Sequence, residues 1–87
     1  MKISQVSFTI NALSDYQYWQ KQDRKTLKSL NKIIDDIVRH PFAGLGKPEP
    51  LKYNLDNCWL RRINKTDRLV YTVTKDSLII IQCRYHY

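Results

Sequence analysis

Two kinds of hydrophobic pattern divide the 87-residue chain. Near its start, Val6, Phe8 and Ile10 alternate with polar residues, which is the period of a β-strand. Between residues 11 and 40 the apolar positions recur at steps of three and four residues, which is the period of an α-helix. Beyond residue 50, short apolar runs are separated by polar turns and indicate further strands. The pattern therefore predicts one strand, a helical part and then a set of strands.

The helical part divides into two predicted helices. The first begins near Asn11 and ends near Gln20, and one of its faces carries Leu13, Tyr16 and Trp19. Such a stripe is typical of core packing. Asp23 is a good N-cap for the second helix, and Pro41 stops that helix. The apolar face of the second helix consists of Leu27, Leu30, Ile34, Ile37 and Val38.

The second half of the chain is expected to form strands at residues 51–53, 59–63, 69–73 and 77–85. Because short polar turns separate them, neighbouring strands should pair as antiparallel hairpins. We predict a single α+β domain over residues 1–87, with an antiparallel sheet and the two helices packed on one face. The hydrophobic content of 43% is enough for one modest core.

The charge balance indicates a polyanionic partner. Lys and Arg number 15 against 8 Asp and Glu, a formal charge of +7, which favours nucleic acid, an acidic protein or a membrane surface over a basic surface that only aids solubility. No stretch approaches the roughly 20 apolar residues of a membrane span, and no apolar signal region follows Met1. We therefore expect a cytoplasmic protein. Cys58 and Cys83 lie far apart in apolar contexts, which predicts buried, reduced thiols and no zinc or redox site.

One carboxylate stands out as a candidate for chemistry. Glu49 lies between Pro48 and Pro50, which restrict the backbone on both sides. A carboxylate held in this way suits proton transfer, although a solvated loop residue is the simpler interpretation. Lys47 and Lys52 add positive charge around it.

Two adjacent arginines must differ in their surroundings. Successive side chains of a strand point to opposite faces, so Arg61 and Arg62 cannot serve the same site. Trp59 and Ile63 share the parity of Arg61 and indicate the face that the helices cover. Arg62 is then the better candidate for the open face. Arg61 would be a charged residue on a face that is otherwise apolar, which is unfavourable.

The chain stops on Arg84, Tyr85, His86 and Tyr87, directly after an apolar run. On a regular strand Arg84 and His86 share one face and Tyr85 lies on the other, which favours core packing for Tyr85. A histidine, with an unperturbed pKa of about 6.5, can donate a proton near neutral pH. A glutamate base, a histidine acid and an arginine on the phosphate form a set that can cleave RNA. Composition alone does not establish this, because many small basic proteins offer such residues.

Four separate motifs resemble the YoeB family of bacterial toxins, which belongs to the RelE superfamily of endoribonucleases. They lie at residues 44–52, 59–63, 68–71 and 83–87. The segments 16–20 and 31–36 match the helical half of the same family, so the resemblance covers about residues 12 to 87. It implies a RelE-like fold and an enzyme that cleaves mRNA in the A site of translating ribosomes, without a metal or other cofactor. It also implies neutralisation by an acidic antitoxin of the YefM type, and it suggests a homodimer.

The resemblance also implies roles for individual residues. Glu49 resembles the general base of the family, His86 its general acid, Arg68 its phosphate-stabilising arginine and Tyr87 the terminal tyrosine that orients the substrate. Lys52 and Arg62 match basic positions near the scissile phosphate, Lys47 is a candidate for contact with the RNA backbone, and Arg84 is a candidate for a further RNA contact.

Two other classes of function remain open at this stage. A basic module that binds nucleic acid or the ribosome without chemistry would carry the same charge. A protein whose basic face only holds an acidic partner would do so too. The binding module without chemistry has no use for a restrained Glu49 together with the terminal His86.

Overall fold

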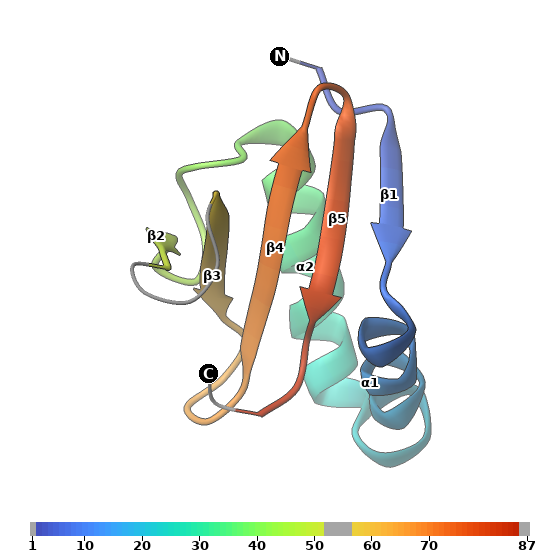
Figure 1. The fold of residues 1–87 in the computed structure, drawn as a ribbon. Coiled ribbons are helices and arrows are strands. Elements are labelled where there is room, and N and C mark those ends of the chain that lie inside the picture. Colours follow the sequence, from blue (N-terminus) through green and yellow to red (C-terminus); the bar gives the residue numbers. More distant parts are fainter. Residues whose placement is uncertain (1, 52–56, 86–87) are drawn as a thin grey trace.

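The computed structural model describes residues 2–51 and 57–85. In chain order they form strand β1 (Gln5–Phe8), helices α1 (Ile10–Gln22) and α2 (Arg24–Arg39), and strands β2 (Glu49–Pro50), β3 (Cys58–Arg62), β4 (Arg68–Thr74) and β5 (Ser77–Gln82) (Figure 1). The helices, β3 and β4 therefore lie close to their predicted bounds. β2 ends before Leu51, the one described residue of the strand expected at 51–53, and β5 ends at Gln82 instead of residue 85.

The described strands form one mixed sheet in the order β1-β5-β4-β3-β2. Neighbours from β2 to β5 run antiparallel, which confirms the predicted meander. β1 instead lies parallel to β5, with Val6 opposite Leu78, so the expectation of a wholly antiparallel sheet is wrong for this pair. A short turn sets the direction only of the strands that it joins. Both helices and three strands separate β1 from β5 along the chain, so no turn signal applied to them.

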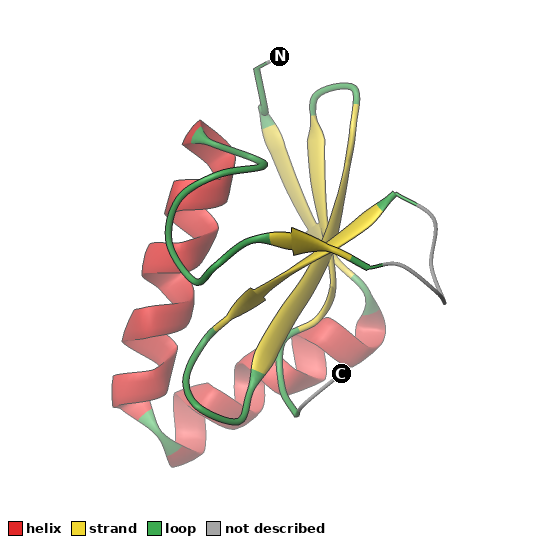
Figure 2. Cartoon of the chain, turned by 90° about the vertical axis from the view of Figure 1, so that its left-hand side faces the viewer, coloured by secondary structure: helices red, strands yellow, loops and turns green. Residues whose placement is uncertain are grey.

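Both helices cover the same face of the sheet, as predicted (Figure 2). Asp23 is the N-cap of α2, and its carboxylate accepts hydrogen bonds from the Thr26 backbone N–H at 3.1 Å and the Thr26 hydroxyl at 2.7 Å. Thr9 caps α1, because its Oγ1 accepts from the Ala12 N–H at 3.0 Å. Ile10 was expected in the first strand but opens α1, and its side chain is 88% exposed. Neither α1 nor α2 is long and apolar enough to cross a membrane, and the described residues contain no other helix.

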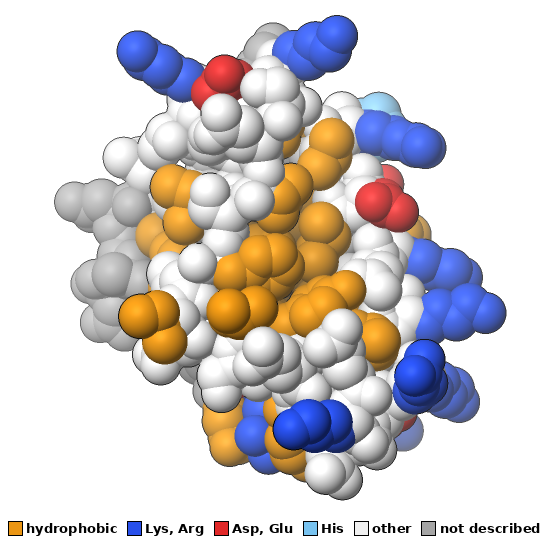
Figure 3. Space-filling view, turned by 90° about the vertical axis from the view of Figure 1, so that its right-hand side faces the viewer, with side chains coloured by type: hydrophobic (Ala, Val, Ile, Leu, Met, Phe, Trp, Pro, Cys, Tyr) orange, Lys and Arg blue, Asp and Glu red, His pale blue; other side chains and the backbone are white. Residues whose placement is uncertain are grey.

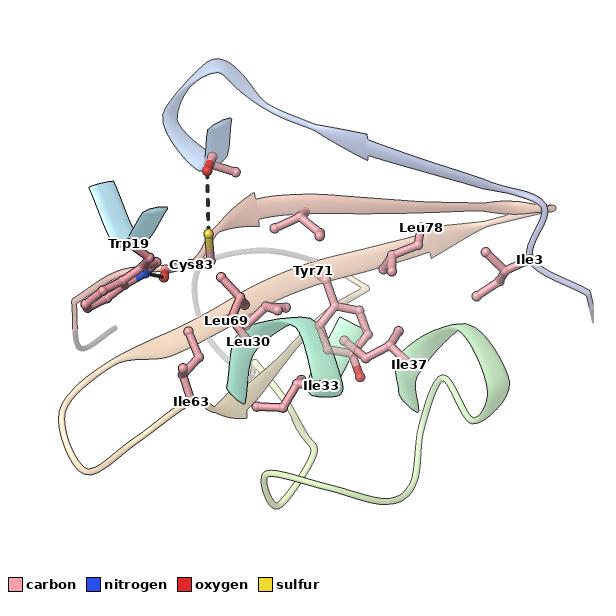
Figure 4. Packing of buried hydrophobic residues seen from close by; sticks show 12 residues of the cluster. Ile3, Trp19, Leu30, Ile33, Ile37, Ile63, Leu69, Tyr71, Leu78 and Cys83 are labelled. Atoms are coloured by element: carbon pink, nitrogen blue, oxygen red, sulfur yellow. Dashed lines mark hydrogen bonds between the residues drawn. The ribbon is translucent and has the colours of Figure 1, made fainter. Parts of the chain in front are cut away.

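The core lies between the two helices and the sheet (Figure 4). It is formed by Ile3, Ala12, Trp19, Leu30, Ile33, Ile37, Ile63, Leu69, Tyr71, Leu78, Ile80 and Cys83. Trp19 joins α1 to the chain that follows β5, because its indole N–H donates to the Cys83 carbonyl at 2.8 Å. The helical prediction is therefore confirmed for Trp19, whereas Leu13 of the same stripe remains 46% exposed.

Both cysteines are buried thiols, as predicted. Cys83 packs against α1, and its Sγ lies 3.5 Å from the Ala12 carbonyl oxygen. Burial, together with the nearby negative charge of Asp15, raises the pKa of the Cys83 thiol to about 12. The thiol is therefore protonated at neutral pH and is a poor nucleophile.

An exposed apolar area lies on the side of the molecule formed by β1 and α1 (Figure 3). Val6 of β1 is 42% exposed, and Ile10 and Leu13 of α1 are also exposed. Lys and Arg side chains lie around this area. Because β1 is the last strand on its side of the sheet, its outer backbone groups also face outward there.

The indole contact of Trp19 generates a stability prediction. Trp19→Phe keeps an aromatic ring in the core but leaves the buried Cys83 carbonyl without its donor, and an unsatisfied buried group costs about 1–3 kcal/mol. We expect urea unfolding to show a loss of that size. Trp59→Phe is the matched control, since the Trp59 ring is only half-buried, beside Phe42. An equal or larger loss in the control would contradict the importance of the Trp19 hydrogen bond.

Candidate active site

Three candidate site residues share the face of the sheet that the helices leave uncovered. Glu49 lies opposite Leu60 in the β2–β3 pair, and Arg62 lies opposite Arg68 in the β3–β4 pair. Opposite residues of paired strands point to the same face, as do residues two apart along one strand. Glu49, Arg62 and Arg68 therefore face the same way. Arg62 is diagonal to Glu49, which corresponds to a backbone separation of about 7–8 Å.

Arg62 and Arg68 line one depression of about 330 Å³, together with Ile63, Asn64 and Lys65. Arg62 is exposed, whereas Arg68 is only 9% exposed. The Nη1 group of Arg68 donates to the carbonyls of Asn64 at 2.9 Å and of Asp67 at 3.0 Å, and its Nη2 lies 3.5 Å from the Lys65 carbonyl. The β3–β4 turn therefore orients the guanidinium in the wall of a positively charged depression.

A second arginine holds the loop that leads to Glu49. Arg61 lies on the helix-facing side of β3 and is fully buried, which confirms the predicted separation of Arg61 from Arg62. Its guanidinium forms an ion pair with Asp36 of α2 at 2.5 Å. It also donates to the backbone carbonyls of His40, Ala43 and Leu45. The Tyr71 hydroxyl lies 3.2 Å from its Nε. We refer to Arg61 and these partners as the Arg61 cluster.

The loop between α2 and β2 is thus fastened at several points. Besides the Arg61 cluster, the Tyr71 hydroxyl donates to the Pro41 carbonyl at 2.6 Å, and the Arg62 N–H donates to the Gly46 carbonyl at 2.7 Å. Gly46 has a φ of 78°, and a Cβ there would lie 2.7 Å from the Arg62 carbonyl oxygen, so only glycine fits this close approach. Lys47 is exposed on the same loop. Glu49 therefore follows a loop of defined shape, as its flanking prolines predicted.

Asp36 is the one carboxylate of the Arg61 cluster. It accepts a hydrogen bond from the Leu45 N–H at 3.0 Å in addition to its ion pair. The Leu45 hydrogen bond and then the Arg61 guanidinium lower the pKa of this carboxyl below its usual value of 3.8. Asp36 is therefore charged throughout the neutral range, and the buried Arg61 has a permanent counter-ion.

A β-bulge near the end of β5 changes which face of the sheet the following side chains point to. Val70 pairs with Gln82, whereas Tyr71 pairs with Ile80, so Ile81 is an extra residue on β5. This shift turns Gln82 to the same face as Val70 and leaves Cys83 facing the core. The bulge therefore resets the alternation of side chains just before the chain reaches its last residues.

The expected core position of Tyr85 is wrong. Its side chain is 60% exposed, and its backbone φ is 69°. The alternation of a regular strand cannot predict the exposure of this residue, because β5 ends at Gln82 and the bulge has already shifted the alternation by one residue. Arg84 is half-buried, and its guanidinium stacks between the rings of Tyr18 and Tyr85.

The remaining predicted site residues, Lys52, His86 and Tyr87, lie outside the described residues. Sequence reasoning missed the role of Arg61, although the presence of an arginine among strand residues of apolar parity was a signal for a buried ion pair. Within residues 2–51 and 57–85, no group of three or more His, Cys, Asp and Glu side chains is arranged to hold a metal ion.

Comparison with known protein families shows which family this chain belongs to. Residues 8–87 match the family model of the YoeB-like toxin of bacterial type II toxin-antitoxin systems. The chain belongs to the YoeB family. Toxin YoeB of Streptomyces coelicolor is 52% identical over 82 residues, which cover 94% of this chain and 98% of the relative. Toxin YoeB of Escherichia coli K12 is 58% identical over 73 residues, 84% of this chain and 87% of the relative.

Solved structures of YoeB toxins share the whole fold. A YoeB/ParE toxin from Agrobacterium tumefaciens superposes with a TM-score of 0.92 at 43% identity, and a YoeB dimer from Staphylococcus aureus with a TM-score of 0.91 at 41% identity. A heterotetrameric YoeB–YefM toxin–antitoxin complex from S. aureus contains a chain with a TM-score of 0.88 at 41% identity. Each match covers 100% of both chains. The predicted RelE-like α+β fold and the membership of the YoeB family are thereby confirmed.

The Arg61 cluster predicts a large difference between two adjacent arginines. Arg61→Ala removes the counter-ion of Asp36 and the donor to several loop carbonyls, and breaking a buried ion pair in this way costs about 3–5 kcal/mol. Arg62→Ala removes an exposed side chain and should change stability by no more than about 0.5 kcal/mol. Urea unfolding of both variants measures the difference. Similar stability of the two variants would show that the cluster does not hold the fold.

The charge state of Asp36 predicts a stability loss in acid. Because its pKa is lowered in the folded protein, its contribution is complete above its ordinary value of 3.8 and is lost as the pH falls through the lowered value. Asp36→Asn should be less stable than the parent at neutral pH, and the difference should shrink as the pH falls below about 3.8. Thermal unfolding at a series of pH values from about 6 down to about 2 measures the difference. A difference that stays constant over this range would contradict the assignment.

Proposed function

We propose that this chain is a ribosome-dependent endoribonuclease toxin that cleaves mRNA in the ribosomal A site and so inhibits translation. The observation that carries the proposal is the common face of the sheet shared by a carboxylate, Glu49, and two arginines, Arg62 and Arg68. Membership of the YoeB toxin family supports it independently. Because ribosomes are the site of action, we expect the protein to work in the cytoplasm.

The proposed chemistry is general acid–base catalysis at the RNA backbone. Glu49 takes the proton of a 2′-OH, and the resulting oxygen attacks the adjacent phosphorus. The bond from phosphorus to the 5′ oxygen breaks while His86 gives that oxygen a proton. The products are a 2′,3′-cyclic phosphate and a 5′-OH. Since the nucleophile belongs to the RNA, the mechanism requires no metal-bound water.

Arg68 has the role of stabilising the charge that develops on the phosphate. Among the described contacts, the turn carbonyls engage three of the five N–H donors of this guanidinium, one of them at 3.5 Å. The guanidinium is therefore oriented before RNA binds, which is the condition for effective electrostatic catalysis. Tyr87 has the role of orienting the substrate.

The remaining basic residues are proposed to bind the RNA backbone. Lys47, Lys52, Arg62 and Arg84 are the candidates. Their charges belong to the net charge of +7, which favours association with mRNA and ribosomal RNA. This association should weaken as salt is added, because phosphate contacts release counterions.

The proposed protein partner is a cognate acidic antitoxin of the YefM type. A YoeB–YefM complex of a protein with the same fold and 41% identity supports this partner, and the basic surface of the chain suits an acidic segment that orders on binding. A homodimer is proposed on the basis of the S. aureus YoeB dimer.

The proposed base predicts a loss of cleavage without a loss of binding. Glu49→Gln keeps the length of the side chain and the pairing of the backbone with β3, but the amide cannot accept the 2′-OH proton. The rate of cleavage should therefore fall by about 10²–10⁴-fold. His86→Ala should cause a loss of the same order. Primer-extension mapping of mRNA cuts after brief expression measures both, with translation active and with translation blocked.

Ribosome co-sedimentation provides the control for these variants. Both variants should still sediment with ribosomes, because neither change removes one of the Lys or Arg side chains proposed to bind the RNA backbone. Full cleavage by Glu49→Gln would reject the mechanism. The alternative function, a basic module that binds nucleic acid or the ribosome without chemistry, predicts that the unchanged protein inhibits translation and leaves the mRNA uncut.

A further inference from the structure

Tyr85 combines exposure with a strained and immobilised backbone. Its φ of 69° lies in the left-handed region, which bulky residues rarely occupy. The backbone is held there from both sides: the Tyr85 N–H donates to Asp67 Oδ1 at 2.7 Å, and the Tyr85 carbonyl accepts from the Arg68 N–H at 2.9 Å. Strain of this kind persists where the surroundings enforce it, and such sites are often functional.

The ring of Tyr85 is also held in place by a stack of side chains. The Arg84 Cζ atom lies 3.3 Å from the centre of the Tyr18 ring and 4.4 Å from the centre of the Tyr85 ring. Tyr18 belongs to α1, so the stack joins Arg84 and Tyr85 to a helix. Tyr85 nevertheless remains 60% exposed. An aromatic ring that is fixed and yet open to solvent offers a ready surface for stacking, because little side-chain entropy remains to be lost.

Polar groups surround this ring. A depression of about 270 Å³ is lined by Asn11, Asp15, Gln82, Arg84 and Tyr85. Amides, a carboxylate and a guanidinium supply both donors and acceptors, which are the groups that read the edge of a nucleobase. The carboxylate is itself oriented, because Asp15 Oδ2 accepts from the Cys83 N–H at 3.1 Å.

We propose that Tyr85 is a stacking platform for one unpaired nucleobase of single-stranded RNA, and that the polar lining of this depression contacts the edge of that base. This inference rests on the proposed function and extends it. The Tyr85 carbonyl accepts a hydrogen bond from the Arg68 N–H, so the backbone of the platform residue is joined directly to that of the arginine assigned to the phosphate. Tyr85 is thus a positioning residue for the RNA and takes no part in proton transfer.

The test compares two variants at this position. Tyr85→Asn removes the ring but tolerates a positive φ, so the backbone is expected to remain folded. Tyr85→Phe retains the ring and removes only the hydroxyl. The probe is a fluorescently labelled six-nucleotide RNA with 2′-O-methyl groups, which cannot be cleaved, used intact and with one abasic position at a time. Fluorescence anisotropy gives the dissociation constants, and thermal unfolding checks the fold.

Wild-type protein and Tyr85→Phe should each lose about tenfold in affinity when one particular base is removed, as expected for one stacked base. Tyr85→Asn should bind the intact RNA about tenfold more weakly and should be insensitive to the loss of that same base. A merely structural role would instead weaken binding of every RNA by the same factor, abasic or intact. That result, or wild-type affinity of Tyr85→Asn, would overturn the proposal.

The probe separates this inference from the proposed function. If the wild-type protein leaves mRNA uncut during translation, the proposed function fails, while base-dependent binding of the non-cleavable RNA still tests the platform. If the wild-type protein cuts mRNA but shows no base-dependent binding through Tyr85, the platform alone fails.

Discussion

The contacts of the buried Arg61 guanidinium are the interaction on which the arrangement of the candidate active face, the open face of the sheet that carries Glu49, Arg62 and Arg68, depends. It joins β3, from which it projects, to an earlier segment of the chain: the end of α2 through Asp36, and the loop that follows α2 through backbone carbonyls. A buried charge is costly unless it is paired and hydrogen-bonded throughout. The N–H groups of Arg61 bond to several carbonyls of the loop and so hold the loop in one conformation. This loop leads to Glu49 in β2.

Three turns or irregularities then bring chemical groups to the same region. The β3–β4 turn orients Arg68 through its carbonyls. The bulge at Ile81 turns Gln82 outward and sends Cys83 into the core, where Trp19 and Ala12 hold it. The strained Tyr85 lies two residues after Cys83. A regular sheet would place alternate side chains on fixed faces, so these departures from regularity distinguish the candidate active face from an ordinary sheet surface.

The two faces of β3 have different surroundings, which explains why the adjacent Arg61 and Arg62 differ so strongly in burial. Arg61 faces the helices and holds the loop, whereas Arg62 faces outward beside Glu49 and Arg68. Alternation along a strand makes this possible within two residues. The residue that holds the loop and the residue proposed to contact RNA are thereby neighbours in sequence but lie on opposite faces of the sheet.

Local patterns in the sequence by themselves determined the two helices, the antiparallel meander from β3 to β5 and the outward position of Arg62, because periodicity and short turns act between residues close together in the chain. The four motifs at residues 44–52, 59–63, 68–71 and 83–87 together indicated the family. Only the tertiary structure decided the parallel pairing of β1 with β5, the partners of Arg61 and the exposure of Tyr85. Each of these depends on contacts between distant segments or on a bulge, and neither leaves a periodic signal in the sequence.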